Sequence, residues 1–594
     1  MNTTTPASPQ LKIATLNDIP VHLKPYVVAQ EPELYTPMDH AAWRFIMKIS
    51  MAFFAQHAHP KYLDGLKATG ISPERIPLLT EMDEKLSQFG WHCVGVAGFI
   101  PPAIFLEFLS LGVLPIACDM RKFEHIAYTP APDIVHESAG HAPIIAAPDY
   151  ARYLHNYGEV ARRAIFSHKD LLLYEAIRHL SDVKEDPHST EEMRQAAQRG
   201  FEKAYADLDI VSEATKLARM SWWTIEYGLV GTLENFKIYG AGLLSSVDES
   251  YNCIRPHVVK FELDASCIEQ SYDITKPQPQ LYIAKDFQEL NVVLDEFAET
   301  MAFRRGGFYA LERAREAQTV TTTELDCGLQ ICGILESFEK DAAGELAFLK
   351  FSGPMQLAHE DHELRGLGPA GLTGGFLCPV GKLKNCDKSL HELSVKELQT
   401  MGYRWNQKAR LEWTSGYVVE GVLASPITRG GRRLALELHD ARILDAKGKI
   451  VFEVHGEERS LIIPCAKTAL RTFGGAADRP AYLSVTDRGP SKLFKHKSNL
   501  TAENEDLNKA YALVREMREK SAFDAVKFRS VITTVADHPH DWLIRFEILE
   551  QRQAWKLDET LIKKLLAEME ARTSEGKHVE DMLSRGKPLI GLNS

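Results

Sequence analysis

The sequence predicts an α+β multidomain protein with a helical N-terminal half, a β-rich middle and a helical C-terminal region. Apolar residues at helical spacing fill most of residues 39–305. Short β-branched or alternating runs, separated by glycine-rich or charged turns, occupy residues 320–475, and apolar helical faces return after residue 498. A chain of 594 residues is longer than one hydrophobic core usually supports, so several domains are expected.

The composition excludes several classes of protein. The chain is 45% hydrophobic and 25% charged, which excludes a disordered or fibrous protein. The net charge of −12, without a dense Lys/Arg run, argues against nucleic acid as the main partner. No apolar run approaches the roughly 20 residues that span a membrane, and the N-terminus lacks the pattern of a signal peptide. We therefore expect no membrane partner, a cytoplasmic location and nine reduced cysteines.

The N-terminal half is expected to form one domain over residues 31–315, after a loosely ordered lead-in at residues 1–30. Strand signals are few in this half. The spacing of apolar residues predicts helices at 41–54, 77–89, 102–111, 150–180 and 190–227. It predicts strands at 91–99 and 281–284.

The C-terminal half has two predicted parts, a β-rich domain of unknown role over residues 320–475 and a helical region over residues 498–594. The strands expected in the β-rich domain are 325–338, 417–424, 433–444 and 450–455. In the helical region Asp558 is the expected N-cap of one helix. Its leucine- and methionine-rich faces favour a bundle core or a subunit interface, so a homo-oligomer formed through the C-terminal half is a hypothesis.

The segment that carries chemistry is TPAPDIVHESAGHAP, Thr129–Pro143. His136 and His141 are five residues apart, whereas the zinc proteases with an HExxH motif use a spacing of four. Five residues of ideal α-helix turn through about 500°, which would leave the two rings about 140° apart. Both rings can face one ion only if the helix is distorted or ends there, which Gly140 permits.

A pair of histidines requires a third ligand, and a carboxylate would complete the facial triad of non-haem iron(II) oxygenases. Glu226 is the best candidate because it lies within an otherwise apolar helical run, MSWWTIEYGL. A buried carboxylate needs a cation or a metal ion. On residue type and spacing alone, ordinary core or surface histidines and a salt-bridged core glutamate remain open alternatives.

The chain resembles the aromatic amino acid hydroxylases, the pterin-dependent iron monooxygenases. Five segments match this family in order, and together they span about residues 35–310. They are VAGF (Val96–Phe99), the Thr129–Pro143 block, WWTIEYGL (Trp222–Leu229), YGAGLLSS (Tyr239–Ser246) and QPQLYIAKDF (Gln278–Phe287).

The resemblance implies two cofactors, iron(II) and a tetrahydropterin such as tetrahydrobiopterin. It assigns His136, His141 and Glu226 to the iron, as catalytic metal ligands. The pterin would stack on Phe105. The other residues implied at the pterin are Gly98 and Ile100 beside its ring, and Glu137 at the pterin or its water shell.

The resemblance also implies the residues that bind the amino acid substrate. Arg121 matches the family's arginine for the α-carboxylate, which a guanidinium fork can bind through two hydrogen bonds. Thr129 and Ser245 would assist at the amino and carboxylate groups, and Pro132 and Trp222 would form walls of the aromatic pocket.

The activity that the resemblance implies is hydroxylation of the ring of a free aromatic amino acid with O2, phenylalanine to tyrosine being the first choice. The alternatives are a hydroxylase acting on tryptophan or tyrosine, a catalytically idle binding or scaffold relative, and, more remotely, a zinc hydrolase.

Several positions depart from the family pattern. Ser221 precedes Trp222 where the family commonly has an aromatic residue, and Ser138 and Ala139 replace the usual bulky pair between the two histidines. The stretch from His141 to Glu226 is longer than in compact relatives, so a surface insertion is expected near residues 162–212. The resemblance does not extend to residues 320–594.

Overall fold

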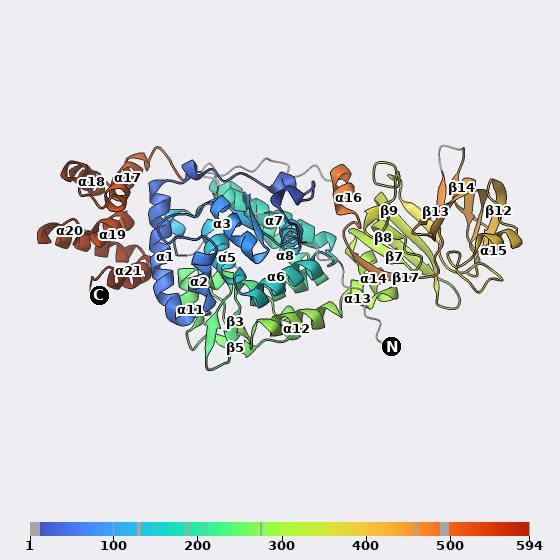
Figure 1. Cartoon of the computed structure of the whole chain (residues 1–594), viewed down its shortest axis with the longest axis horizontal. Helices are drawn as coiled ribbons and strands as arrows, with labels where there is room; N and C mark the ends of the chain where they lie inside the picture. The colour runs from blue at the N-terminus through green and yellow to red at the C-terminus, as the bar shows by residue number, and fades with distance from the viewer. Residues whose placement is uncertain are drawn as a thin grey trace.

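The computed structural model of the chain describes residues 12–98, 100–127, 132–185, 189–208, 211–273, 276–456, 460–486 and 498–592. The molecule is elongated, with the N-terminal helical unit in the middle, the β-rich part at one end and the last helices at the other (Figure 1). The chain therefore passes from the β-rich end to the opposite side of the N-terminal unit before it ends.

The N-terminal unit is mostly helical, as predicted. Its helices are α1 (Pro37–His57), α2 (Lys61–Ala68), α3 (Leu79–Leu86), α4 (Pro102–Ser110), α5 (Ala142–Ile145), α6 (Pro148–Ala161), α7 (His168–Glu185), α8 (Glu191–Ala206), α9 (Glu213–Ser221), α10 (Ala241–Ser245), α11 (Val247–Cys253), α12 (Phe287–Ala298), α13 (Ala302–Arg305) and α14 (Gly307–Ala317). Its strands are β1 (His92–Val96), β2 (Val113–Ala117), β3 (Leu229–Gly231), β4 (Phe236–Ile238), β5 (Val259–Glu262) and β6 (Gln280–Ala284), of which β1 pairs in parallel with β2 and the others form a sheet in the order β4-β3-β6-β5.

Local sequence explains the central helix of this unit. Thr36 and Asp39 form a capping box at the start of α1, and Pro37 occupies the first helical position, where its missing N–H costs nothing. Most of α1 is buried, because helices pack on it from both the N-terminal and the C-terminal parts of the chain. The helix α1 therefore contacts both parts of the chain.

Three predicted features of this unit differ from the structure. Residues 12–30 are not a loose lead-in, because Ile19, Leu23 and Tyr26 are buried against β1 and α4. The predicted helix at 150–180 is interrupted at 162–167, between α6 and α7, and the one predicted at 190–227 ends with α8 at Ala206 and resumes with α9 at Glu213. Within the range where an insertion is expected, α7 and α8 pack on each other and have a small core of their own around Leu180, Val183 and Ala197.

The β-rich part contains two antiparallel sheets. The first has the order β10-β9-β8-β7-β17, with β11 also paired to β9, and the second has the order β12-β13-β14-β15, with β16 paired to β14. The strands are β7 (Val320–Leu325), β8 (Gln330–Lys340), β9 (Leu346–His359), β10 (His362–Glu363), β11 (Phe376–Pro379), β12 (Gln407–Glu412), β13 (Val418–Arg429), β14 (Arg432–Leu444), β15 (Ile450–Val454), β16 (Leu461–Pro464) and β17 (Ala469–Gly474), with the helices α15 (Val395–Thr400) and α16 (Arg479–Thr486).

One hydrophobic core joins the two sheets, and α14 contributes Leu311 and Ala314 to it. This helix therefore packs with the β-rich part, although it lies mostly within the range predicted for the N-terminal domain. The predicted strand 325–338 is in fact the end of β7, a turn and most of β8, because Asp326–Leu329 reverse the chain.

The last helices are α17 (Glu505–Glu519), α18 (Ala525–Asp537), α19 (Trp542–Glu550), α20 (Glu559–Glu570) and α21 (Lys577–Leu589). The Asp558 side chain accepts a hydrogen bond from Leu561 N, so the predicted N-cap of α20 is confirmed. These helices share one core with the N-terminal unit: Phe45 of α1 packs edge to face on Trp542 and Phe546 of α19. Arg44 of α1 forms buried ion pairs in the same interface.

All nine cysteines are free, and eight of them are buried. Among the helices of the described residues, none combines the length and the apolar character needed to cross a bilayer.

Candidate metal centre

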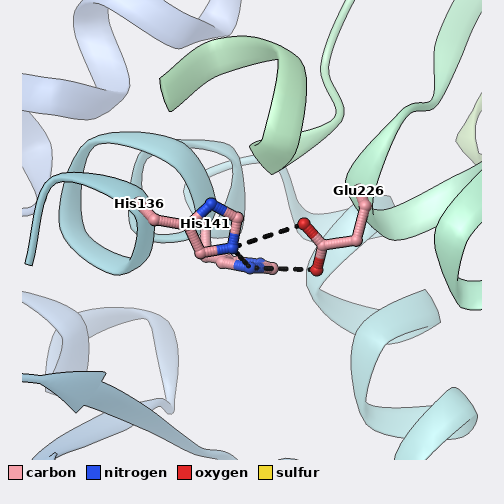
Figure 2. A group of neighbouring side chains, drawn as sticks. All are labelled: His136, His141 and Glu226. Carbon is pink, nitrogen blue, oxygen red and sulfur yellow. Dashed lines mark hydrogen bonds and ion pairs between the residues drawn. The ribbon is translucent and has the colours of Figure 1, made fainter. Parts of the chain in front are cut away.

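Three side chains from two separate segments converge in the N-terminal unit. His136 and His141 project from one helical turn and Glu226 approaches from another (Figure 2). Nε2 of His141 lies 3.2 Å from Nε2 of His136 and 3.3 Å from a Glu226 oxygen, while the other Glu226 oxygen lies 3.4 Å from Nε2 of His136. One ligand atom from each residue falls within 4.8 Å of the others, so one ion could contact all three.

Both segments that supply these ligands are π-helical. His136 and His141 lie on η6 (Val135–His141), and Glu226 ends η7 (Trp222–Glu226). A π-helix closes its hydrogen bonds between residues i and i+5, so residues five apart lie near one another on its surface. This is the distortion that the spacing of the two histidines requires. A Cβ on Gly140 would lie 2.7 Å from the Ala241 carbonyl oxygen, so glycine there allows η6 and α10 to approach closely.

The protonation states of His136 and Glu226 suit a cation, whereas His141 would have to lose a proton to bind one. Burial lowers the pKa of His136 to about 4, so its ring is neutral near pH 7. Although burial disfavours the charged form of Glu226, the two histidines outweigh it and lower the pKa of this carboxyl to about 2. Burial also opposes the protonation of His141, but the Glu226 carboxylate raises the pKa of His141 overall. A bound metal ion would replace the His141 proton as the partner of Glu226.

Ser245 fixes the orientation and tautomer of His136. Its Oγ donates to the Ala241 carbonyl oxygen at 2.8 Å and lies 2.9 Å from Nδ1 of His136. Because the hydroxyl proton is used on Ala241, Oγ accepts from Nδ1–H, which leaves the Nε2 lone pair directed at the centre. Nδ1 of His141 is buried and has no hydrogen-bond partner among the described residues.

Replacing Ser245 by alanine is expected to weaken metal binding roughly 10–100-fold, the usual effect of losing a hydrogen bond that orients a histidine ligand. Competition with a chelator for iron(II) measures this. Ser250→Ala is the matched control, because the Ser250 hydroxyl is also buried in a helix but donates only to the Val247 carbonyl oxygen. Equal affinities of the Ser245→Ala variant and the wild type would contradict this role of Ser245.

Arg121 is held beside the centre by a carboxylate that the sequence reasoning missed. Its Nε and Nη2 donate to the two oxygens of Asp133 at 2.7 and 2.8 Å, and its Nη1 donates to the Ser245 carbonyl oxygen at 3.2 Å. Asp133 also accepts from the backbone N–H of His136 at 3.0 Å. The signal for Asp133 was its position three residues before His136, where an acidic side chain can cap a helical turn.

Two of the residues predicted at the pterin, Phe105 and Glu137, lie near His141 of the centre. The half-buried ring of Phe105, on α4, is 6.5 Å from the His141 ring. Glu137 is buried; its Oε2 lies 3.8 Å from Nε2 of His141 and has no hydrogen-bond partner among the described residues, and burial raises the pKa of this carboxyl to about 8. Ile100 packs in the core beneath α4, whereas Gly98 is exposed and adopts a positive φ of 64°.

Trp222 lies in a stack of aromatic rings. Tyr272 is parallel to it at 4.3 Å, and Tyr227 stacks at 4.6 Å on it as well. Burial, with a smaller contribution from the negative charge of Glu226, raises the pKa of the Tyr272 hydroxyl to about 12. Sequence reasoning missed Tyr272, since no spacing pattern links it to Trp222. Pro132 is half-buried, and Thr129 lies outside the described residues.

Two imidazoles and one carboxylate in this arrangement define a mononuclear non-haem metal site of the kind that holds iron(II) and leaves positions open for other ligands. The model of the family described as biopterin-dependent aromatic amino acid hydroxylase matches residues 25–164 and 201–322. Through this part of its length, the chain belongs to the aromatic amino acid hydroxylase family and is a pterin-dependent oxidoreductase. The unmatched residues 165–200 contain α7 and most of α8 and lie within the range where the insertion is expected.

Comparison with curated proteins gives the same family. Phenylalanine-4-hydroxylase of Chromobacterium violaceum is 26% identical over 275 residues, 46% of this chain and 75% of that protein. The enzyme of the same name from Pseudomonas aeruginosa is 29% identical over 272 residues, 44% of this chain and 86% of that protein. A crystal structure of the Chromobacterium violaceum enzyme with iron(III) and 7,8-dihydrobiopterin is 24% identical, covers 46% of this chain and 86% of that chain, and aligns with a TM-score of 0.37.

Proposed function

We propose that the protein hydroxylates free L-phenylalanine to L-tyrosine, using iron(II), a tetrahydropterin and O2. The observation that carries this proposal is the convergence of His136, His141 and Glu226, whose ligand atoms lie within 4.8 Å of one another. The curated relatives named above are phenylalanine hydroxylases, which favours phenylalanine over the other aromatic amino acids.

In this proposal His136, His141 and Glu226 hold the iron. Bound iron and pterin together supply the chemistry that activates O2, while the protein supplies ligands, orientation and a site from which bulk water is excluded. Ser245 keeps the His136 lone pair directed at the ion. The carboxylate of Glu226 would lower the net charge of the iron site.

The pterin would lie against Phe105 and within reach of Glu137, both of which lie near His141. Among the described residues the buried Glu137 Oε2 has an ion pair with His141 Nε2 at 3.8 Å but no hydrogen-bond donor, so it can take a ligand or a water molecule as a further partner. With its pKa raised to about 8, Glu137 keeps a proton near pH 7 and can donate a hydrogen bond to a pterin nitrogen or carbonyl group. These two residues therefore fit a flat heterocycle with polar edges.

The amino acid would be bound by Arg121 and the aromatic stack. A guanidinium has five N–H groups, and the bonds to Asp133 and to the Ser245 carbonyl oxygen use three of them. The remaining two are available for an α-carboxylate. Trp222 and Pro132 would border the ring of the substrate, and Tyr272, by stacking on Trp222, would keep that wall in place.

Product analysis tests this proposal. The protein is loaded anaerobically with iron(II), supplied with a synthetic tetrahydropterin and O2, and given phenylalanine, tyrosine or tryptophan in separate reactions. We expect tyrosine from phenylalanine, with consumption of tetrahydropterin in step with product. A hydroxylated product from tryptophan or tyrosine alone would contradict the choice of substrate. No pterin consumption with any of the three would indicate a binding or scaffold role.

A further inference from the structure

The buried carboxylate of Glu107, on the side of α4 opposite Phe105, joins three separate parts of the chain. Glu107 Oε1 lies 2.9 Å from Nε2 of His22, and its Oε2 accepts from Nη1 of Arg479 at 3.1 Å. The Glu107 side chain is only 8% exposed and that of Arg479 only 14%. His22 belongs to the packed segment before α1, and Arg479 belongs to α16, which follows the last strand of the β-rich part.

Arg479 is held firmly on the side of the β-rich part. The residue before it, Asp478, exchanges two backbone hydrogen bonds with the Gln356 side chain, at 3.0 and 3.1 Å. A carboxylate oxygen of Asp478 also accepts from Glu363 N at 2.9 Å. Gln356 and Glu363 lie on β9 and β10, so the first sheet of the β-rich part sets the position from which Arg479 extends.

Gly474 and Arg479 form the junction between the β-rich part and the N-terminal unit, and this junction also contacts the end of α6. Gly474 N donates to the Arg163 carbonyl oxygen at 2.9 Å, and a Cβ on Gly474 would lie 1.9 Å from the Ala164 carbonyl oxygen. Nη2 of Arg479 donates to the carbonyl oxygens of Arg162 and Gly474. The Arg479 guanidinium therefore connects the β-rich part to α6 and to α4 at once.

The helix that receives this contact also carries Phe105. Two residues along an α-helix turn through about 200°, so Phe105 and Glu107 point to opposite sides of α4. Phe105 faces the metal centre, 6.5 Å from the His141 ring, while Glu107 faces the junction. A displacement of Glu107 would therefore move or tilt the ring on which the pterin is proposed to stack.

We propose that Arg479 is a positioning residue, through which the β-rich part of the chain fixes α4 and thereby sets the affinity of the pterin site. This inference rests on the proposed function, because it uses the assignment of Phe105 to the pterin. Breaking one side of a buried ion pair leaves an uncompensated charge. Without Arg479, the Glu107 carboxylate keeps only His22, and α4 must shift or loosen to reach water.

The test is the binding of 7,8-dihydrobiopterin, measured by calorimetry on the full-length protein, together with steady-state kinetics. In Arg479→Ala we expect the dissociation constant of 7,8-dihydrobiopterin and the KM for tetrahydropterin to rise about 10-fold. The iron content, and the kcat at saturating pterin, should change less than 2-fold. Arg479→Lys keeps the charge but not the planar fork, so an intermediate loss is expected. If Arg479→Ala does not fold, the affinity of Arg479→Lys for 7,8-dihydrobiopterin tests the inference in its place.

Two further variants make the test specific. Glu107→Gln removes the buried charge, so in the double variant with Arg479→Ala the loss in pterin affinity should be smaller than the sum of the single losses. Arg471→Ala is the matched control, since Arg471 forms its ion pair with Glu324 at 2.8 Å within the β-rich part. Its pterin affinity should equal that of the wild type.

Unchanged pterin affinity in a folded Arg479→Ala protein would overturn the inference. An equal loss in Arg471→Ala would overturn it too, because the effect would then reflect general loosening of the β-rich part. Failure of the proposed function looks different: the wild type itself would neither bind 7,8-dihydrobiopterin nor consume tetrahydropterin.

Discussion

Glu226→Gln is expected to abolish pterin-coupled hydroxylation. The expected loss in kcat is at least about 1,000-fold, which is typical when an essential active-site group is removed. The carboxylate lies 3.3 and 3.4 Å from the two histidine Nε2 atoms and is the only anionic ligand in the described centre. An amide keeps the size of the side chain but loses its negative charge. Product formation and iron content, measured on the same sample, test this.

Glu234→Gln is the matched control, because Glu234 is an exposed glutamate that follows Glu226 by eight residues. It should keep wild-type iron content and activity. The thermal unfolding temperature of Glu226→Gln should stay close to that of the wild type, because losing the ion pairs is offset by no longer having to bury a charge. Full turnover by Glu226→Gln, with or without iron, would show that the metal ligands are assigned wrongly.

Phe546→Ala is expected to lower the free energy of unfolding by about 3–5 kcal/mol, the usual cost of deleting a buried phenylalanine side chain. Phe546 is 1% exposed, and its ring packs edge to face on Phe45 at 4.8 Å. Gly586 of α21 also lies against both rings, so little can move into the cavity. Because α1 belongs to the N-terminal unit, we expect this unit to unfold together with the C-terminal helices.

Denaturant unfolding, followed by both tryptophan fluorescence and loss of hydroxylase activity, measures this effect. Phe523→Ala serves as the comparison, since Phe523 lies in the same helical region but is 44% exposed and should cost much less. A Phe546→Ala protein that unfolds in two separate steps, with activity lost only in the second, would contradict a shared core.

The metal ligands could be predicted from the sequence because their chemistry is local. The spacing of His136 and His141 excluded a regular α-helix, and the structure provides the π-turn that this spacing needs. Glu226 stood out as a carboxylate in an apolar run. The assignments of Phe105, Glu137, Arg121 and the other cofactor and substrate residues came from the family resemblance and remain predictions that the experiments above address.

The arrangement of the parts could not be predicted from the sequence. The change from helical to alternating periodicity located the β-rich part, but periodicity does not reveal which strands share a sheet. The apolar faces of α17 to α21 were visible, whereas their burial against α1 depends on contacts across more than 450 residues. Likewise, Glu107 and Arg479 are unremarkable in sequence, and only the fold makes them partners.

The most direct test of the central claim is anomalous diffraction at the iron absorption edge, from crystals grown anaerobically with iron(II). We expect one strong peak, marking an iron ion that is coordinated by Nε2 of His136, Nε2 of His141 and a carboxylate oxygen of Glu226. A peak held by other residues, or no peak at these three in protein that still converts phenylalanine to tyrosine, would contradict the account.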